Sequence, residues 1–377
     1  MWHNVLEHLS TQVEVGYWND PARSRFRPPP SVWLTDGHHG PLGVPEPTVV
    51  HLQEASWQHE STRPHLQPWF LDHFERHSRE AVEVAAAVLT PSESSRKQIL
   101  DEYGLDPWRV HTVPLGVDLA LFRPGRPGAE EILEAAGGNP SVPYVLFVSS
   151  LSPRKNLGAL KVAMNALALR GLPHSLVISG SPSPDRRDWK EMAAEAASDL
   201  PDVPGRVVFL GSLSDVELAA VTAGATAFCL PSLMEGFGLT ALEAMACGVP
   251  VVVSDRGSLP EVVADAGVIT EPTAEALEVA LHDLLVSPKR REELSRAGLA
   301  RALQLSWRAT ADGWLKVLRQ TVPSPEFGSF EWIPPPGFAR SALQHGLRLP
   351  LARRSGKLDR RAATPSSSFP PSVPPEH

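Results

Sequence analysis

One stretch of the chain decides the fold: residues 231–250 read PSLMEGFGLTALEAMACGVP. The stretch leaves a predicted strand, passes through a tight loop with two glycines, Gly236 and Gly238, and enters a predicted helix near Gly238 or Leu239 that ends at Gly248. Glycine lets the backbone approach a ligand closely, and the free amides at a helix N-terminus favour an anion. The stretch therefore predicts an anion-binding loop between a strand and a helix.

Two carboxylates flank this loop. Glu235 lies in the loop at the end of the strand, and Glu243, eight positions later, falls in the first turns of the helix. A carboxylate beside a phosphate site would repel the phosphate. We therefore interpret both side chains as acceptors for the hydroxyl groups of a sugar or a ribose.

A second polar cluster follows an earlier strand of the same half of the chain, where residues 147–157 read FVSSLSPRKNL. In a doubly wound sheet this loop opens on the same edge as the glutamate loop. Arg154 and Lys155 could then reach a diphosphate from the opposite side and stabilise negative charge as a leaving group departs. The alternative is a solvated Arg-Lys pair at a helix start, and the neighbouring glutamate loop favours the diphosphate.

Residues 141–310 alternate between strand-like and helical segments. The strand-like runs are rich in Val, Ile and Phe and lack two-sided alternation, as is typical of strands covered on both faces. These runs are 144–148, 175–178, 206–210, 226–230 and 249–254. The helical segments are 157–169, 189–197, 215–223, 239–246 and 274–285. The alternation predicts an α/β domain with a parallel sheet that binds ligands at the carboxyl ends of its strands.

The first 120 residues predict a second α/β unit with fewer strands. Its helical segments are 2–12, 68–86 and 93–103, and its strand-like segments are 13–17, 32–34, 48–52 and 87–90. The run VPLGVD at 113–118 and the Gly- and Pro-rich stretch that follows indicate a connection between domains. We therefore divide the chain into an N-terminal domain (1–124), a linker (125–143), a second domain (144–320) and a tail (321–377).

Composition separates the tail from the domains. The chain has 377 residues and 38 prolines, eleven of them after residue 320, where apolar periodicity is absent. We expect this tail to be disordered. It carries a small positive charge with the pairs Arg353-Arg354 and Arg360-Arg361, so it either is a solvated segment without a partner or contacts an acidic membrane surface or protein. A net charge of −8 argues against a nucleic-acid-binding protein.

Neither a cationic start followed by an apolar run nor a membrane-length apolar run occurs in the sequence, so we expect a cytoplasmic protein, with peripheral contact at the inner face of a membrane as the alternative. Cys229 and Cys247 lie in apolar segments, and we expect both to be buried and reduced. The 14 histidines match no familiar ligand spacing, so we expect no metal site.

These motifs together resemble the C-terminal domain of the retaining GT-B glycosyltransferases of family four, which includes glycogen-synthase-like and mannosyltransferase-like enzymes. The resemblance rests on the E-x7-E pair Glu235/Glu243 within the quoted stretch. It is extended by P-R-K-N at 153–156, the strand with Gly180 at its end, F-L-G at 209–211, S-L-P-E-V at 258–262, the helix around Ser306-Trp307, and T-P-S-E-S-S-R and V-P-L-G-V-D within 81–124. The resemblance implies a GT-B fold, with two Rossmann-like domains facing a cleft.

The resemblance also implies roles for single residues. Glu243 would bind the ribose of a nucleoside diphosphate sugar, Glu235 would bind hydroxyls of the transferred sugar, and Arg154 and Lys155 would neutralise the diphosphate. The other residues expected at the donor site are Gly236, Phe237, Gly238, Leu239, Ser150, Gly180 and Gly211. The chain has no D-x-D motif, so we expect a metal-independent enzyme without a cofactor. The resemblance implies that the enzyme retains anomeric configuration.

The sequence departs from the family pattern at two places. Ser150 stands where many relatives have an arginine, and Gln53-Glu54 stand where a His-Asp pair is usual, which leaves His51 as the candidate acceptor-side histidine. No G-G or G-x-G occurs in the first 60 residues, and the chain begins in what is read as the helix after the family's first strand and Gly-rich loop, so we expect an incomplete N-terminal domain.

Three functions are compatible with these residues. We favour transfer of a hexose to a glycan or lipid-linked acceptor, and the P-R-K-N form points toward GDP-mannose as the donor. The second is a non-catalytic relative that binds a nucleotide sugar or acts as a scaffold. The third, a nucleotide-sugar epimerase of the same architecture, is disfavoured by the E-x7-E loop.

Overall fold

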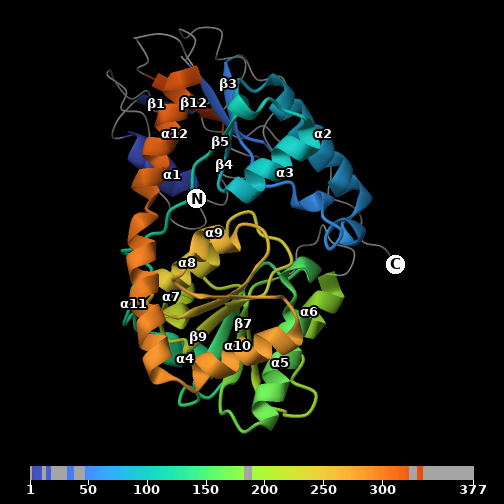
Figure 1. Ribbon diagram of the computed structural model, residues 1–377, viewed down its shortest axis with the longest axis vertical. Coiled ribbons are helices and arrows are strands. Elements are labelled where there is room, and N and C mark those ends of the chain that lie inside the picture. Colours follow the sequence, from blue (N-terminus) through green and yellow to red (C-terminus); the bar gives the residue numbers. More distant parts are fainter. Residues whose placement is uncertain are drawn as a thin grey trace, which may run out of the picture.

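The computed structural model describes residues 2–10, 14–17, 32–37, 47–181, 189–321 and 329–333. They form two six-stranded sheets in which every strand pair is parallel. Figure 1 shows one sheet with its helices at the top of the molecule and the other at the bottom. This is the expected α/β architecture of two Rossmann-like domains, and we call the upper one the N-terminal domain and the lower one the C-terminal domain.

The C-terminal sheet has the order β11-β10-β9-β6-β7-β8. Its strands are β6 (Tyr144–Val148), β7 (Ser175–Ser179), β8 (Val207–Gly211), β9 (Ala227–Leu230), β10 (Val251–Ser254) and β11 (Val268–Thr270). Every residue of β6, β7, β9 and β10 is buried, because helices cover both faces of the sheet. The order jumps from β9 to β6 in the middle of the sheet, and such a switch point places a crevice at the carboxyl ends of these two strands.

The N-terminal sheet has the order β1-β12-β2-β3-β4-β5. Its strands are β1 (Glu14–Tyr17), β2 (Trp33–Asp36), β3 (Thr48–His51), β4 (Ala87–Thr90), β5 (Val110–Thr112) and β12 (Ser329–Ile333). The buried strands β3 and β4 lie beside one another. An apolar core of this domain forms between these strands and the helices α2 and α3.

The helices divide between the two sheets. Those of the N-terminal domain are α1 (Trp2–Ser10), α2 (Pro68–Val84), α3 (Glu93–Tyr103) and α12 (Trp307–Thr321). Those of the C-terminal domain are α4 (Ala129–Ala135), α5 (Leu157–Leu169), α6 (Trp189–Ala197), α7 (Asp215–Ala223), α8 (Leu239–Ala246), α9 (Leu259–Val263), α10 (Ala274–Leu285) and α11 (Pro288–Gln304). Figure 1 shows α11 and α12 running along one side of the molecule, from the lower domain to the upper one.

Helix α12 follows the C-terminal domain in the chain but packs on the N-terminal domain. It packs on α1 and β4, and Thr310 Oγ1 donates to the carbonyl of Pro114 at 2.8 Å. The backbone of Val117 donates to Leu305 at 3.1 Å, so the connecting run at 113–118 lies against the start of this helix. Buried side chains from both sheets therefore form one continuous apolar core.

The structure corrects several predicted elements. The stretch 125–143 was expected to be a linker, but it contains helix α4, which packs on α7 and buries Leu133. Strands β5 and β11 and helix α9 were not predicted, because each has only three to five residues and no periodicity can be read over so short a run.

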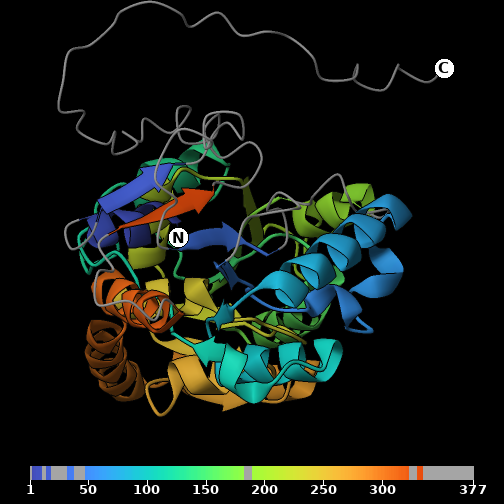
Figure 2. The same ribbon diagram turned by 90° about the horizontal axis from the view of Figure 1, so that it is seen from above.

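The expectation of a disordered tail is wrong for residues 329–333. These residues form β12, which pairs in parallel with β1 on one side and β2 on the other. Figure 2 shows β12, in orange-red, beside the dark blue strands of the N-terminal sheet. The run SFEWI contains three good strand formers, Phe, Trp and Ile. It was not predicted as a strand because the prolines on both sides of it are typical of a disordered segment. The remainder of 322–377, including both arginine pairs, lies outside the described residues.

Both cysteines are free and buried, as predicted. Burial raises the pKa of the Cys247 thiol to about 12 and also raises that of Cys229. Within the described residues, no helix combines the length and hydropathy that are needed to cross a membrane.

Trp314 should anchor α12 to the N-terminal domain, because its side chain is 0% exposed. We expect Trp314→Ala to lower the free energy of unfolding by about 3–5 kcal/mol through the lost burial and the remaining cavity. Urea denaturation followed by circular dichroism measures this change. Trp108→Ala is the control, because Trp108 is 71% exposed. Equal effects of the two substitutions would contradict the anchoring role.

Candidate functional site

Two loops at the carboxyl edge of the C-terminal sheet are bound to each other. Residues Pro153–Lys155 form a short 3-10 helix after β6, and the glutamate loop at 231–238 follows β9. The amide of Leu233 donates to the carbonyl of Arg154 at 2.7 Å. The side-chain amide of Asn156 donates, through Nδ2, to the carbonyls of Pro231 and Pro272 at 3.2 and 2.8 Å. The two motifs that the sequence predicted on one edge are therefore in direct contact.

The centre of this contact is a buried ion cluster. The Lys155 ammonium donates to Glu235 Oε1, and Arg154 Nη1 lies 3.6 Å from Glu235 Oε2. Arg154 Nη1 also donates to the carbonyl of Met234 at 2.8 Å. The hydroxyl of Ser232 donates to Glu235 Oε1 at 2.8 Å. The Glu235 carboxylate thus holds two adjacent cations at the end of a strand.

The cluster sets the charge of its members. Burial alone would raise the pKa of Glu235, but the Lys155 and Arg154 charges outweigh burial and hold it below its usual value. Burial would likewise lower the pKa of Arg154, and the carboxylates of Glu54 and Glu235 raise it instead. Burial and the Arg154 charge lower the pKa of Lys155, against the attraction of Glu235. Glu235 is therefore an anion at neutral pH, and Arg154 is a cation beside it.

Glu243 lies in helix α8, whose N-terminus follows the glutamate loop. Gly238 caps this helix in the left-handed conformation, so the amides of Phe237, Gly238 and Leu239 lie at the helix entrance. Burial, together with the nearby Asp215 charge, raises the pKa of Glu243 to about 8. Among the described residues, no hydrogen bond or ion pair joins Glu243 to Glu235, so the two carboxylates occupy separate positions.

The predicted Gly180 and Gly211 lie at the ends of β7 and β8, beside the end of β6. The amide of Gly180 donates to the carbonyl of Gly211 at 2.8 Å, and the amide of Ser149 donates to Ser179 at 3.1 Å. A Cβ at Gly180 would lie 1.7 Å from the carbonyl oxygen of Ser149, so only glycine permits this close approach. Ser150, next along the chain, is exposed. These strand ends lie at the same carboxyl edge of the C-terminal sheet as the two loops.

The N-terminal domain reaches into the site through residues that the sequence did not single out. The hydroxyls of Ser92 and Ser95 both donate to the carbonyl of Gly236, at 2.7 and 3.0 Å. Both serines belong to the run TPSESSR that carried the family resemblance. Their role could not be deduced from sequence because it depends on how close the two domains lie.

Two glutamates make further contacts between the domains. Glu261, of the run SLPEV, accepts hydrogen bonds from the amides of Glu93 and Ser94 at the start of α3, at 2.8 and 2.7 Å. Glu54 Oε1 lies 3.4 Å from Arg154 Nη2. Gln53-Glu54 stand where the family has a His-Asp pair. This departure is the feature of the sequence that points to Glu54 as a site residue.

His51 lies at the end of β3 and is buried. Its imidazole packs against the Trp314 ring of α12, with 4.9 Å between the ring centroids. The structure therefore places this ring in the core beneath the cleft, and the acceptor-side role of His51 stays a prediction.

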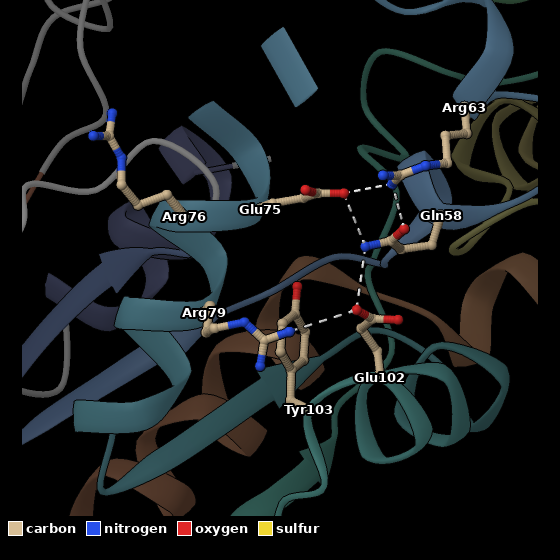
Figure 3. Close-up of a pocket in the computed structure, with 7 residues that line it drawn as sticks. All are labelled: Gln58, Arg63, Glu75, Arg76, Arg79, Glu102 and Tyr103. Atoms are coloured by element: carbon tan, nitrogen blue, oxygen red, sulfur yellow. Dashed lines mark hydrogen bonds and ion pairs between the residues drawn. The ribbon is translucent and has the colours of Figure 1, made fainter. Parts of the chain in front are cut away.

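A separate hollow of about 300 Å³ lies between α2, α3 and the short 3-10 helices before α2. Figure 3 shows that its charged groups pair with one another and that Arg76 points away from the rest. Gln58 Nε2 donates to Glu75 and Glu102 at 3.3 and 3.2 Å, and its Oε1 accepts from Arg63 at 2.6 Å. Because these partners satisfy each other, we interpret the hollow as a polar connection between helices.

Comparison with known proteins identifies the family. The model of glycosyl transferases group 1 matches residues 129–301, and that of glycosyltransferase family 4 matches residues 27–121. The α-maltose-1-phosphate synthase of Mycolicibacterium smegmatis is 32% identical over 309 residues, which are 76% of this chain and 77% of that protein. The chain belongs to the group 1 glycosyltransferases.

This glycosyltransferase also resembles the D-inositol 3-phosphate glycosyltransferase of Segniliparus rotundus, with 37% identity over 58% of this chain and 48% of the relative. It thus spans about half the length of that relative. Among solved structures, sucrose-phosphate synthase from Thermosynechococcus elongatus superposes with a TM-score of 0.61 at 26% identity, over 74% of this chain and 68% of that one. The superposition agrees with the predicted GT-B fold.

The buried cluster should contribute to stability as well as to binding. We expect Glu235→Gln to lower the free energy of unfolding by on the order of 3 kcal/mol, because it leaves two buried cations without their shared anion. The control is Glu278→Gln, which breaks the exposed 2.9 Å ion pair with Arg170 and should change stability by less than about 1 kcal/mol. Urea denaturation compares the two variants. A loss at Glu235 no larger than that at Glu278 would refute the cluster's structural role.

Proposed function

We propose that this glycosyltransferase transfers a hexose from a nucleoside diphosphate sugar to a hydroxyl group of a glycan or lipid-linked acceptor, with retention of anomeric configuration. One observation carries the proposal: Arg154 and Lys155 are held side by side on Glu235, at the carboxyl edge of a doubly wound sheet, and Glu235 belongs to the loop that leads into the N-terminus of α8. Two adjacent cations and a helix N-terminus match the charge of a diphosphate.

The chemistry follows from where charge develops. When the bond between the anomeric carbon and the diphosphate oxygen breaks, negative charge accumulates on the leaving diphosphate. The Arg154 guanidinium and the Lys155 ammonium would stabilise that charge, and because they are already fixed by Glu235 they would need little reorganisation. Glu235 would accept hydrogen bonds from hydroxyls of the sugar, and Glu243 would accept them from the ribose.

Protein cations supply this stabilisation in the proposal, so it needs neither a metal nor a cofactor. The absence of a D-x-D motif supports it. Full activity in the presence of a chelator is the expected result.

The donor base and the acceptor are finer parts of the proposal. The P-R-K-N form at 153–156 favours GDP-mannose. The names of the relatives, D-inositol 3-phosphate glycosyltransferase and sucrose-phosphate synthase, add phosphorylated polyols and sugars to the acceptors worth assaying. Contact with a membrane surface would depend on the arginine pairs after residue 352, and binding to anionic vesicles tests it.

A thermal-shift screen of nucleoside diphosphates and nucleotide sugars tests donor binding. A ligand that binds only the folded protein raises its melting temperature. At a ligand concentration of a hundred times the dissociation constant, the free energy of unfolding rises by about 2.7 kcal/mol. We expect at least one nucleotide sugar to do so, and assays with candidate acceptors then test transfer. Donor binding without transfer to any acceptor or to water would favour the non-catalytic alternative.

Lys155→Ala should lower the transfer rate by about tenfold to a thousandfold, because the leaving diphosphate loses one of its two cations. Steady-state kinetics with the donor from the screen measures the effect. Lys289→Ala, which removes an exposed lysine of the same domain, should leave the rate unchanged. An unaltered transfer rate for Lys155→Ala would contradict the proposed role of Lys155 in stabilising the leaving diphosphate.

Donor affinity should depend on the ionisation of Glu243. Because its pKa is raised to about 8, this carboxyl is mostly protonated at pH 7 and ionises as the pH rises toward 9. A carboxylate accepts ribose hydroxyls better than the protonated acid does, so nucleoside diphosphate affinity should rise over this range by about tenfold. Calorimetry of Glu243→Gln should show this rise removed. If the affinity of Glu243→Gln for the nucleoside diphosphate kept the pH dependence of the wild type, Glu243 would not be the ribose-binding group.

A further inference from the structure

Glu54 is an anion from one domain that lies against the cations of the other. It follows β3 in the N-terminal domain, and its side chain is 13% exposed. Its Oε1 lies 3.4 Å from Arg154 Nη2, and a Cβ placed on Gly236 would lie 2.7 Å from its Oε2. The carboxylate therefore lies between the diphosphate-binding arginine and the glycine loop.

The charges of this cluster are balanced without any ligand. Arg154 and Lys155 supply two positive charges, and Glu235 and Glu54 supply two negative ones. A bound diphosphate adds about two further negative charges next to both carboxylates. At separations of about 4 Å in a partly buried site, each such repulsion costs several kcal/mol. This repulsion opposes the attraction of Arg154 and Lys155 for the diphosphate, and it is relieved if one of the two carboxylates moves away when the donor binds.

The two carboxylates meet the cations from different domains. Glu235 accepts hydrogen bonds from Lys155 and Ser232, and its backbone carbonyl accepts from the amide and hydroxyl of Ser258 at 3.1 Å. Glu54 meets Arg154 at 3.4 Å, longer than a strong charge-assisted hydrogen bond, and across the boundary between domains. The shift of Glu54 requires no change in the C-terminal domain.

We propose that Glu54 is a competing anion: it occupies the diphosphate side of Arg154 in the ligand-free protein and is displaced when a nucleoside diphosphate binds. This proposal rests on the proposed function. Displacement breaks the Glu54–Arg154 contact between the domains, and the Ser92 and Ser95 bonds to Gly236 and the Glu261 cap of α3 do not involve Glu54. Donor binding would thus loosen the cleft beside the diphosphate while the domains stay joined at α3.

Isothermal titration calorimetry of Glu54→Gln tests the competition. The probes are inorganic pyrophosphate, which carries the diphosphate charge alone, and GDP and UDP. Without the competing charge, Glu54→Gln should bind pyrophosphate and the nucleoside diphosphate about threefold to tenfold more tightly than the wild type. Glu60→Gln is the matched control, because it removes the same charge from an exposed position six residues away and should leave both affinities unchanged.

Two further variants show whether the gain acts through Arg154. Glu54→Asp keeps the charge but shortens its reach, so it should give a smaller gain than Glu54→Gln. In an Arg154→Gln background, Glu54→Gln should give no gain.

Unchanged or weaker pyrophosphate binding by Glu54→Gln would overturn the competition, as would the same gain in Glu60→Gln. A failure of the proposed function looks different, because neither the wild type nor Glu54→Gln would then bind any nucleoside diphosphate, while the pyrophosphate comparison could still be read. Unfolding curves of each variant confirm that affinities are compared between folded proteins.

Discussion

The ion pair between Lys155 and Glu235 is the interaction on which the rest of the site depends. Two charges taken out of water are costly unless each finds partners in the right geometry. That requirement explains the local structure: Ser232 donates to the carboxylate, Ser258 fixes the loop backbone, and Asn156 ties the turn before α5 to the glutamate loop. The two loops cannot separate without exposing an unpaired buried charge.

The same constraint connects the two domains. Because the glutamate loop is fixed, its Gly236 carbonyl is a rigid acceptor for the serines of the N-terminal domain, and Arg154 is a fixed partner for Glu54. The apolar core that continues through α12 also holds the domains together. The charged contacts can therefore respond to a bound anion while the apolar contacts keep the domains joined.

The sequence predicts most of the strands and helices of the C-terminal domain and places its two motifs on one edge. Buried parallel strands have a distinctive composition, and the loops that follow them lie at the same edge, but the ion pairs of Arg154 and Lys155 with Glu235 are visible only in the structure. The chain pattern could not show how near the N-terminal domain lies, and Glu54, Ser92 and Glu261 were therefore missed as site residues. Strand β12 was missed for another reason: its five residues are stabilised by pairing with β1 and β2, which are distant in sequence.

The surroundings of His51 depend on residues that are distant in the sequence. A histidine close to a family position is a reasonable candidate for the acceptor side, yet its environment is set by Trp314 of a helix more than 250 positions later. The departure from the family pattern was more informative than the near match, because the glutamate in place of the usual residue is the one that meets Arg154.

The most direct test of this account is a crystal structure of the protein with a bound nucleoside diphosphate. The account predicts that the diphosphate oxygens lie within hydrogen-bond distance of Arg154 Nη2 and Lys155 Nζ, at the N-terminus of α8, with Glu54 turned away from Arg154. A diphosphate bound elsewhere on the molecule, with the Arg154–Glu54 pair intact, would contradict it.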